Sequence, residues 1–253
     1  MSGLSAQETV RALAQPIGDV GGNFMLHPET IAACKDFGYP NGFAYYVVGR
    51  GGVLGDVDAD VVSAAFGPFA PSLVRVMWEA GIGVEGAKAG AQRFADACAA
   101  YGRKRLSDTA DLDRFIELAE KVIAAVPISG HSLFVGWRVL PRPIDNAAHA
   151  YFLMHLLREW RGSAHIMAVA ASGLTPVEAI LTRYFDSGEG VETATKFGWP
   201  PPFADVGHLV ATRAAAEKLT DVLQESVYES ALSPDERAEF VAATQMIVDA
   251  LSR

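Results

Sequence analysis

Apolar residues recur along this 253-residue chain mostly at spacings of three and four, which places them on one face of an α-helix. The longest run with this spacing is 148–181, in which Phe152, Leu156, Ile166 and Val169 suit a face turned towards a core. No long stretch alternates apolar and polar residues as a half-buried β-strand does. The pattern predicts a protein that is mainly α.

Residues that start and stop helices set the limits of the other predicted elements. Thr175 can cap a helix in which Glu178 completes a capping box, and Ser233 can cap a last helix over 234–251. Pro16 is expected to end the first helix, because proline removes a backbone donor from a helix interior. The remaining helices are predicted at 5–13, 28–37, 42–48, 60–66, 71–81, 83–101, 107–126, 146–172, 189–197 and 205–230.

A stretch rich in proline and glycine separates two helical regions. Because prolines break helices, we predict a junction over 127–145 that joins an N-terminal unit, 1–126, to a C-terminal unit, 146–253. Each unit contains a short helix ending in Phe, a turn with Gly, a second short helix and a Trp, over 54–78 and 174–199. Two copies of a helix–turn–helix unit would explain this echo.

Composition and charge narrow the classes of function. The chain carries 21 basic and 30 acidic residues, a formal charge of −9, which disfavours generic binding to nucleic-acid phosphates. Two cysteines are too few for a disulfide framework or a Cys-based zinc site, and we expect no metal. We find neither a signal-peptide pattern nor a run of about 18 apolar residues, so we expect a cytoplasmic protein with no membrane partner.

Ionisable side chains concentrate in the same long run. Arg158, Arg161 and His165 are three and four residues apart, so they form one row on a helix, with His155 one turn earlier and Glu159 beside it. If the row faces a cavity, it can receive a carboxylate, because guanidinium presents a planar fork of donors. If it faces other helices, the same charges form a structural ion-pair network. Both interpretations stay open.

Motifs in both halves resemble a helix–turn–helix family, rich in actinobacterial members, whose function is unsettled. The residues that carry the resemblance are Pro28-Glu29, Gly38, Gly42-Phe43, Gly49-Arg50, Leu54-Gly55, Val57, 61–66 and Phe69-Ala70-Pro71 in the first half, and 156–162, His165, Gly173-Leu174 and Glu178-Ala179 in the second. The resemblance spans nearly the whole chain. It implies two pseudo-symmetric, winged-helix-like units in tandem, with long flanking helices.

The chain departs from the family pattern in three places. Residues 160–163 read Trp-Arg-Gly-Ser where the family commonly has His-Arg-Gly-Asp, and His27 stands where a small residue is usual. The segment 199–202 leads into a long helix where the family has a hairpin wing. A reading helix needs basic or amide side chains for base edges, but 189–197 is acidic and the equivalent in the first unit offers only Arg75. A DNA-binding transcriptional regulator, which the family label suggests, is therefore kept only as the last of three hypotheses, and specific DNA binding is not expected.

Two further hypotheses follow from the same residues. The first is a small-molecule-binding protein whose pocket is mostly apolar with a few polar anchors. Its predicted binding residues are Tyr45, Arg50, Phe66, Phe69, Arg158, Trp160, Arg161 and His165, with Tyr46 and Trp78 as further aromatic candidates. For each aromatic residue taken alone, a place in the hydrophobic core is the better interpretation. A homodimer stays open.

The second hypothesis is an enzyme that uses acid–base groups in the same pocket. Histidine titrates in the useful range and a buried glutamate can be tuned towards it. The candidate catalytic residues are Glu29, His155, Glu159 and His165. The chain has no nucleophile motif, no glycine-rich cofactor loop and no HExxH sequence, so the residues name no cofactor.

Overall fold

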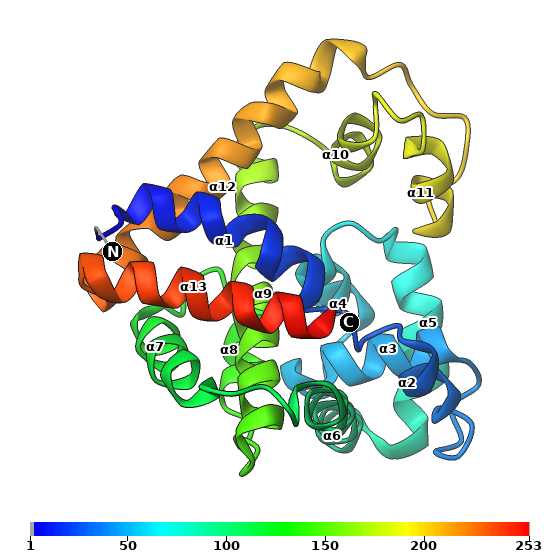
Figure 1. The fold of residues 1–253 in the computed structure, drawn as a ribbon. Helices are drawn as coiled ribbons and strands as arrows, with labels where there is room; N and C mark the ends of the chain where they lie inside the picture. Colours follow the sequence, from blue (N-terminus) through cyan, green and yellow to red (C-terminus); the bar gives the residue numbers. More distant parts are fainter. Residues whose placement is uncertain (1–2, 253) are drawn as a thin grey trace.

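A computed structural model describes residues 3–252, and within them the chain forms helices and loops but no strand (Figure 1). This confirms the prediction of a mainly α protein. The helices are α1 (Ala6–Val20), α2 (Pro28–Ala32), α3 (Gly42–Gly51), α4 (Ala59–Phe66), α5 (Pro71–Glu85), α6 (Ala87–Leu106), α7 (Leu112–Ala125), α8 (Ser132–Arg138), α9 (Asn146–Ala171), α10 (Pro176–Arg183), α11 (Gly190–Lys196), α12 (Val210–Ala231) and α13 (Pro234–Leu251), with short 3₁₀ turns at Gly52–Leu54 and Gly207–Leu209.

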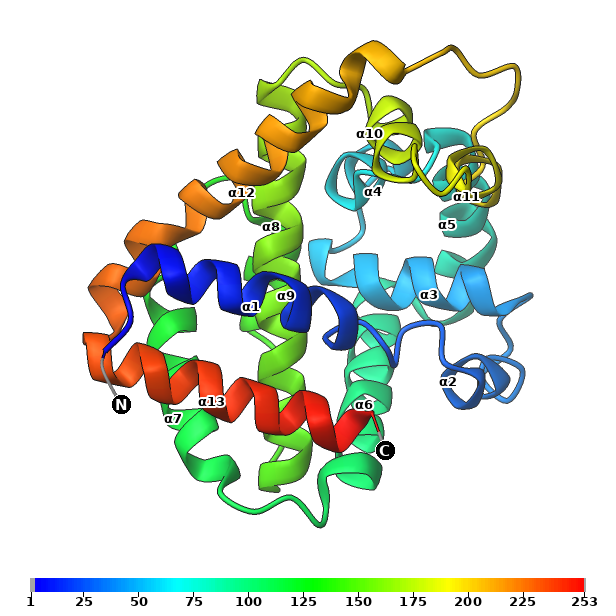
Figure 2. The ribbon, with the colours of Figure 1, turned by 45° about the horizontal axis from the view of Figure 1, so that its top comes forward.

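The long helix α9 is the axis of the molecule. Helices α1, α6, α7, α8 and α12 pack around it (Figure 2). Asp145 caps its first turn by accepting a hydrogen bond from the Ala148 backbone N–H at 2.9 Å. Residues 150–157 are buried on every side, as expected of a helix that is apolar all round. Gly162 does not interrupt α9, which continues to Ala171.

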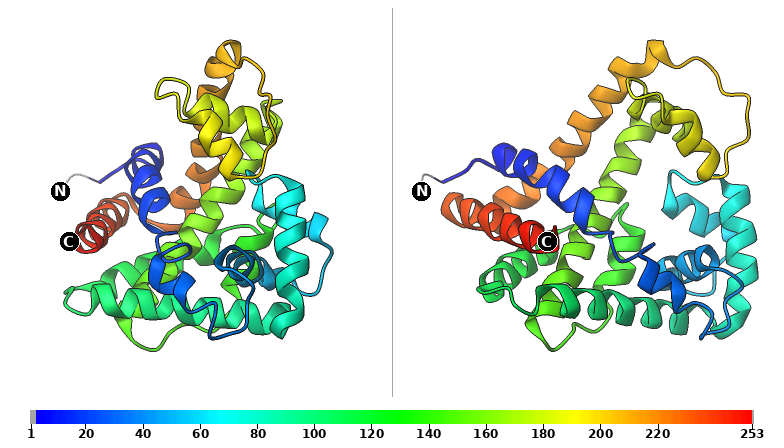
Figure 3. Two further views of the ribbon diagram at one scale, coloured as in Figure 1. Left: turned by 90° about the vertical axis from the view of Figure 1, so that its right-hand side faces the viewer. Right: turned by 45° about the vertical axis from the view of Figure 1, so that its right-hand side comes forward.

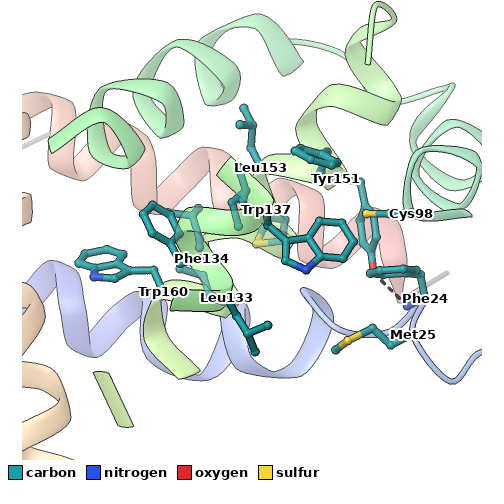
Figure 4. Packing of buried hydrophobic residues seen from close by; sticks show 14 of the residues in the cluster. Phe24, Met25, Cys98, Leu133, Phe134, Trp137, Tyr151, Leu153 and Trp160 are labelled. Carbon is teal, nitrogen blue, oxygen red and sulfur yellow. Dashed lines mark hydrogen bonds between the residues drawn. The ribbon is translucent and has the colours of Figure 1, made fainter. Parts of the chain in front are cut away.

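One hydrophobic core extends from Val10 to Ile247 and draws on both halves of the chain. Phe24, Trp137 and Tyr151 lie at its centre, where the Tyr151 hydroxyl accepts a hydrogen bond from the Phe24 backbone N–H at 3.2 Å (Figure 4). Burying each such aromatic side chain stabilises the fold by about 1.5–3 kcal/mol. The two halves share this core, and their division into units stays a prediction.

Two predicted helix ends are wrong for identifiable reasons. Pro16 lies inside α1, because burial of the apolar face of that helix through Val20 outweighs the lost backbone hydrogen bond. Gly81 lies inside α5, which ends at Gly86 with φ 81°. A Cβ at Gly81 would lie 2.8 Å from a methyl carbon of Val48, so this glycine permits close approach of α3 and is not a stop signal.

The predicted junction contains a helix that proline and glycine content did not indicate. Helix α8 buries Leu133, Phe134 and Trp137 against the core, and the Trp137 indole N–H donates to the Arg50 carbonyl at 3.1 Å. The prolines that suggested a linker therefore flank a short core helix.

Two helix–turn–helix pairs are present, α4–α5 and α10–α11. The capping box of Thr175 and Glu178 forms as predicted at the start of α10. The pair α10–α11 has its own small apolar cluster, which includes Ile180 and Ala194, and stands at one end of the molecule (yellow in Figure 3). Residues 198–206 lead to α12 without a wing. The pseudo-symmetry of the two pairs stays a prediction.

The second pair contacts the first at its turn. The Trp199 indole N–H donates to the Pro68 carbonyl at 2.8 Å, and the Ala70 backbone N–H donates to the Phe197 carbonyl at 2.8 Å. The rings of Phe69 and Phe197 lie 4.5 Å apart between centroids. These contacts hold the turn that precedes α5, whereas Pro71 and Ser72 at the start of that helix stay exposed.

In the described part of the chain, no helix taken alone has both the length and the apolar character needed to cross a membrane. Helices α9 and α10 meet that criterion only as a pair, which is bent by 104°.

Candidate functional site

A buried ion pair joins the end of α3 to the middle of α9. The Arg50 guanidinium donates to both carboxylate oxygens of Glu159, each at 2.9 Å, and its remaining nitrogen donates to the Tyr46 hydroxyl at 3.1 Å. Only 5% and 1% of the two charged side chains are exposed. The Phe66 ring lies 4.6 Å from the guanidinium carbon, a cation–π contact. Arg50 and Phe66, both predicted binding residues, are thereby brought together.

Arg158 brings a second guanidinium to the same carboxylate. It donates to Glu159 at 2.8 Å and, with 27% of its side chain exposed, separates that carboxylate from solvent. Burial alone would raise the pKa of Glu159, but Arg50 and Arg158 outweigh burial and hold that pKa well below its usual range. Burial would lower the pKa of Arg50, and Glu159 raises it instead. All three groups are therefore charged at neutral pH.

His155 completes this group, which we call the Arg158 cluster: Arg50, His155, Arg158 and Glu159. The ring is fully buried, and its Nδ1 lies 3.1 Å from the Gly21 carbonyl, so Nδ1–H donates and Nε2 carries the lone pair. Within residues 3–252, Nε2 has no hydrogen-bond partner. Burial lowers the pKa of His155 to about 4, so the ring is neutral at pH 7.

The net charge of the Arg158 cluster is +1, because two guanidinium groups face one carboxylate and His155 is neutral. Within residues 3–252, the Arg158 guanidinium forms a hydrogen bond only with Glu159, and it uses only one of its nitrogens to do so. Its Nε would lie 3.4 Å from a Cβ at Gly22, and 27% of the side chain is exposed. The cluster can therefore accept an external anion at Arg158.

The other two members of the predicted row point to a different partner, helix α12. We call this group the α12 cluster: Arg161, His165, Glu217, Thr220, Asp221 and Gln224. Arg161 donates to Asp221 at 3.0 Å and to Gln224 at 2.8 Å. His165 Nδ1 lies 3.0 Å from the Thr220 hydroxyl, and burial lowers the pKa of His165 to about 4. These contacts have the form of the structural ion-pair network that the sequence left open.

Gly162 lies one turn after Arg158, and sequence reasoning did not single it out as a site residue. A Cβ at this position would meet no atom within 4 Å, so the glycine is not required for close packing. Glycine inside a helix destabilises it by roughly 0.5–1 kcal/mol relative to alanine. The glycine therefore leaves open space on α9 one turn after Arg158.

The remaining predicted site residues lie elsewhere. Tyr45 and Trp160 are buried in the core, where Trp160 packs against the ring of Tyr228. Phe69 packs on Phe197 at the turn between α4 and α5. Glu29 is exposed at the start of α2 and pairs with Lys104 at 2.6 Å, far along the chain from the Arg158 cluster. The roles predicted for these residues stay predictions.

His131 and Ser163 form a pair that the sequence did not predict. His131 Nδ1 lies 2.6 Å from the Ser163 hydroxyl, which also lies 2.8 Å from the Trp160 carbonyl. A nucleophilic serine needs a base that a third group orients. Within residues 3–252, no third group forms a hydrogen bond with the His131 ring to orient it, so we assign the pair no catalytic role. Because 32 residues separate His131 from Ser163, no local motif in the sequence indicates that they meet.

A cavity of about 410 Å³ opens at the other end of α9, between the last turn of α6 and the start of α7. Asp111, Asp113 and Asp145 line it, and its cation Arg103 is paired with Asp145 at 2.6 Å. Within residues 3–252, no three His, Cys, Asp or Glu side chains are placed to hold a metal ion.

Residues 10–253 match a family described as the Helix-turn-helix family. The chain belongs to this family, which agrees with the resemblance of its motifs. No curated protein matches the chain. No solved structure matches it.

Proposed function

We propose that this member of the helix–turn–helix family binds a small amphipathic anion, with Arg158 as the anchor. The observation that carries the proposal is the charge of the Arg158 cluster: Arg50 alone already neutralises the buried carboxylate of Glu159. Arg158 therefore adds a cation that the fold does not require for neutrality, and it stands at the solvent side of the cluster. A carboxylate or phosphate can pair with it through the planar fork of donors.

The surroundings of Arg158 favour a ligand that is apolar beyond its anionic group. Gly162 leaves space on the same face of α9, and Ile166, one further turn along, is only partly buried. Met25 and the Gly22 backbone lie beside Arg158 on the other side. A ligand with its charge at Arg158 can extend over Gly162 towards Ile166.

Charge and exposure at the two helix–turn–helix pairs favour ligand binding over reading of DNA. Arg75 on α5 pairs with Asp60 and Glu79, and Lys196 on α11 pairs with Glu192 at 2.6 Å. The basic groups that would face phosphates are therefore already neutralised, and residues 197–199 contact the turn that precedes α5.

A chemical step at the same place is the alternative, because His155 Nε2 holds a free lone pair beside Glu159. The ring has no exposed surface, so a substrate would reach it only after displacing Arg158. Binding without turnover is the simpler use of this geometry.

The test is calorimetric titration of the protein with fatty and aromatic carboxylates, each beside its neutral amide. We expect carboxylates to bind and Arg158→Ala to weaken binding by about 1.5–3 kcal/mol, or roughly 10- to 150-fold, the range for a hydrogen bond to a charged group. Arg158→Lys should not restore binding, because ammonium lacks the fork. Arg75→Ala, which removes an arginine already paired with acids, is the matched control.

Gly162→Leu provides the second arm, because it fills the open space without touching the charges. We expect it to abolish binding while the protein stays folded. Equal binding by wild type, Arg158→Ala and Gly162→Leu would refute the site. Saturable, sequence-selective binding of duplex DNA at nanomolar concentration, measured by fluorescence polarisation, would refute the preference for a ligand over DNA.

A further inference from the structure

Helix α12 runs along the outer edge of the molecule (Figures 1 and 2), and its outward side carries several exposed apolar residues. Val222 and Leu223 are 54% and 40% exposed, and Leu219 is partly buried. Ala211, Ala214 and Ala215 continue the exposed face towards the start of the helix. Isolated exposed apolar residues are common on proteins, but exposed alanine, valine and leucine side chains that recur in a stripe over about three turns of one helix favour an interaction surface.

The opposite face of α12 is fully used inside the molecule. Asp221 and Gln224 bind Arg161 of α9, and Thr220 is completely buried. The exposed stripe therefore has no role in the contact with α9. It is also distinct from the Arg158 cluster, so a partner bound to the stripe is independent of the proposed ligand.

Two charges border the stripe on one edge. Lys218 and Glu225 are seven residues apart, which is about two helical turns, so both lie on the same side of the helix. Neither forms a salt bridge within residues 3–252, although most other charges on neighbouring helices do. This border of one cation and one anion is self-complementary under a two-fold axis.

We propose that α12 pairs antiparallel with α12 of a second copy of this chain, with the two-fold axis passing beside Val222. A two-fold contact brings residue i onto residue j and residue j onto residue i. An axis midway between Lys218 and Glu225 therefore places each lysine opposite the glutamate of the other copy and forms two ion pairs at once. Val222 meets its own equivalent at the centre.

The side chains along the stripe fit this register. Small Ala215 lies near small Ser226 of the second copy, which allows the helices to approach closely, and Leu219 packs beside Val222 of the second copy. Glu229 falls opposite Ala214, so no like charges meet. A single helix pair is at the low end of interface sizes, so we expect a reversible dimer with a micromolar dissociation constant.

The test is sedimentation equilibrium of the full chain at concentrations from about 1 to 300 µM, a range that brackets micromolar dissociation. Lys218→Glu alone and Glu225→Lys alone should each raise the dissociation constant at least about tenfold, because each places like charges opposite one another. The double swap, Lys218→Glu with Glu225→Lys, should return it to within about threefold of wild type. Restoration by the swap identifies the antiparallel register, which a general loss of stability would not reproduce.

Val222→Asp should give a monomer throughout, and Val76→Asp is its matched control, because Val76 on α5 is equally exposed at 55%. Circular dichroism of each variant separates dissociation from unfolding. A monomeric wild type at 300 µM would overturn the proposal and leave the stripe to a different partner. A dimer that survives Val222→Asp or that the double swap does not restore would also overturn it.

Discussion

The two charge clusters on α9 use the same residue types in different surroundings. In the Arg158 cluster, the carboxylate of Glu159 and the guanidinium of Arg50 are almost fully buried. In the α12 cluster, Arg161 is 16% exposed and its partner Asp221 is 25% exposed. Water can therefore replace a lost partner in the second cluster but not in the first.

This difference separates two uses of charge on one helix. A buried pair contributes little net stability when intact, because desolvation offsets the attraction, yet breaking it is severe. A partly exposed network joins two helices at moderate cost and tolerates change better than a fully buried pair. We expect substitutions in the two clusters to differ in size and in the conditions that reveal them.

Removal of Glu159 should have the largest effect. Glu159→Ala leaves Arg50 buried without a counter-charge, and we expect a loss of about 3–5 kcal/mol in the free energy of unfolding. Urea denaturation at pH 7 measures it. The double variant Arg50→Met with Glu159→Leu removes both charges and should recover most of the loss. If the free energy of unfolding of Glu159→Ala lay within about 1 kcal/mol of the wild-type value, the pair would not be desolvated.

The second effect depends on pH and concerns His155. Its pKa is about 4 in the folded chain against an ordinary value of 6.5, so only the unfolded chain takes up the proton between these values. Stability is complete above pH 6.5 and falls by about 1.4 kcal/mol per pH unit towards pH 4. Wild type should thus lose about 2 kcal/mol more than His155→Gln between pH 7 and pH 5. Parallel pH profiles of the two proteins would contradict the buried neutral ring.

Arg161→Ala tests the second cluster and should cost less. It leaves Asp221 and the buried Gln224 without a donor, so we expect a loss of about 1–2 kcal/mol. A double-mutant cycle with Asp221→Ala should give a coupling energy below about 1 kcal/mol, as for other partly exposed pairs. A cost as large as that of Glu159→Ala would erase the distinction between the clusters.

The smallest effect has the opposite sign. Gly162→Ala should stabilise the protein by about 0.5–1 kcal/mol, because a Cβ meets no atom there and alanine favours the helix. Thermal unfolding detects it. The same variant should bind carboxylates no better than wild type, since the added methyl group begins to fill the space beside Arg158. Destabilisation would mean that the glycine serves packing after all.

Local signals in the sequence predicted much of the fold. The capping box at Thr175, the N-cap at Ser233 and the start of α9 at Asn146 are where the sequence places them, because caps depend on residues a few positions apart. The helix ends predicted at Pro16 and Gly81 were wrong, because tertiary packing decides whether such residues end a helix. The prolines around α8 misled for the same reason.

The candidate site was only half predictable. Arg50, Arg158 and Glu159 were each singled out by residue type, but nothing local states that Arg50 and Glu159 meet across 109 residues. The helical row correctly placed Arg158 and Arg161 one turn apart. It did not indicate that Arg158 faces the ion pair with α3 while Arg161 faces α12, because the packing of the whole chain decides which helix lies next to each residue.

The placement of α1 has a consequence for synthesis on the ribosome. Its apolar face, which includes Val10, Leu13 and Ile17, packs against α12 and α13 as well as α9. The Leu4 backbone N–H also donates to the Pro234 carbonyl at 2.9 Å. Helix α1 is synthesised about 190 residues before α12 and more than 210 before α13, so at roughly 5–20 residues per second it lacks these partners for on the order of ten seconds or more. During that time the apolar face of α1 is exposed on the nascent chain, where a chaperone that binds apolar helices can cover it.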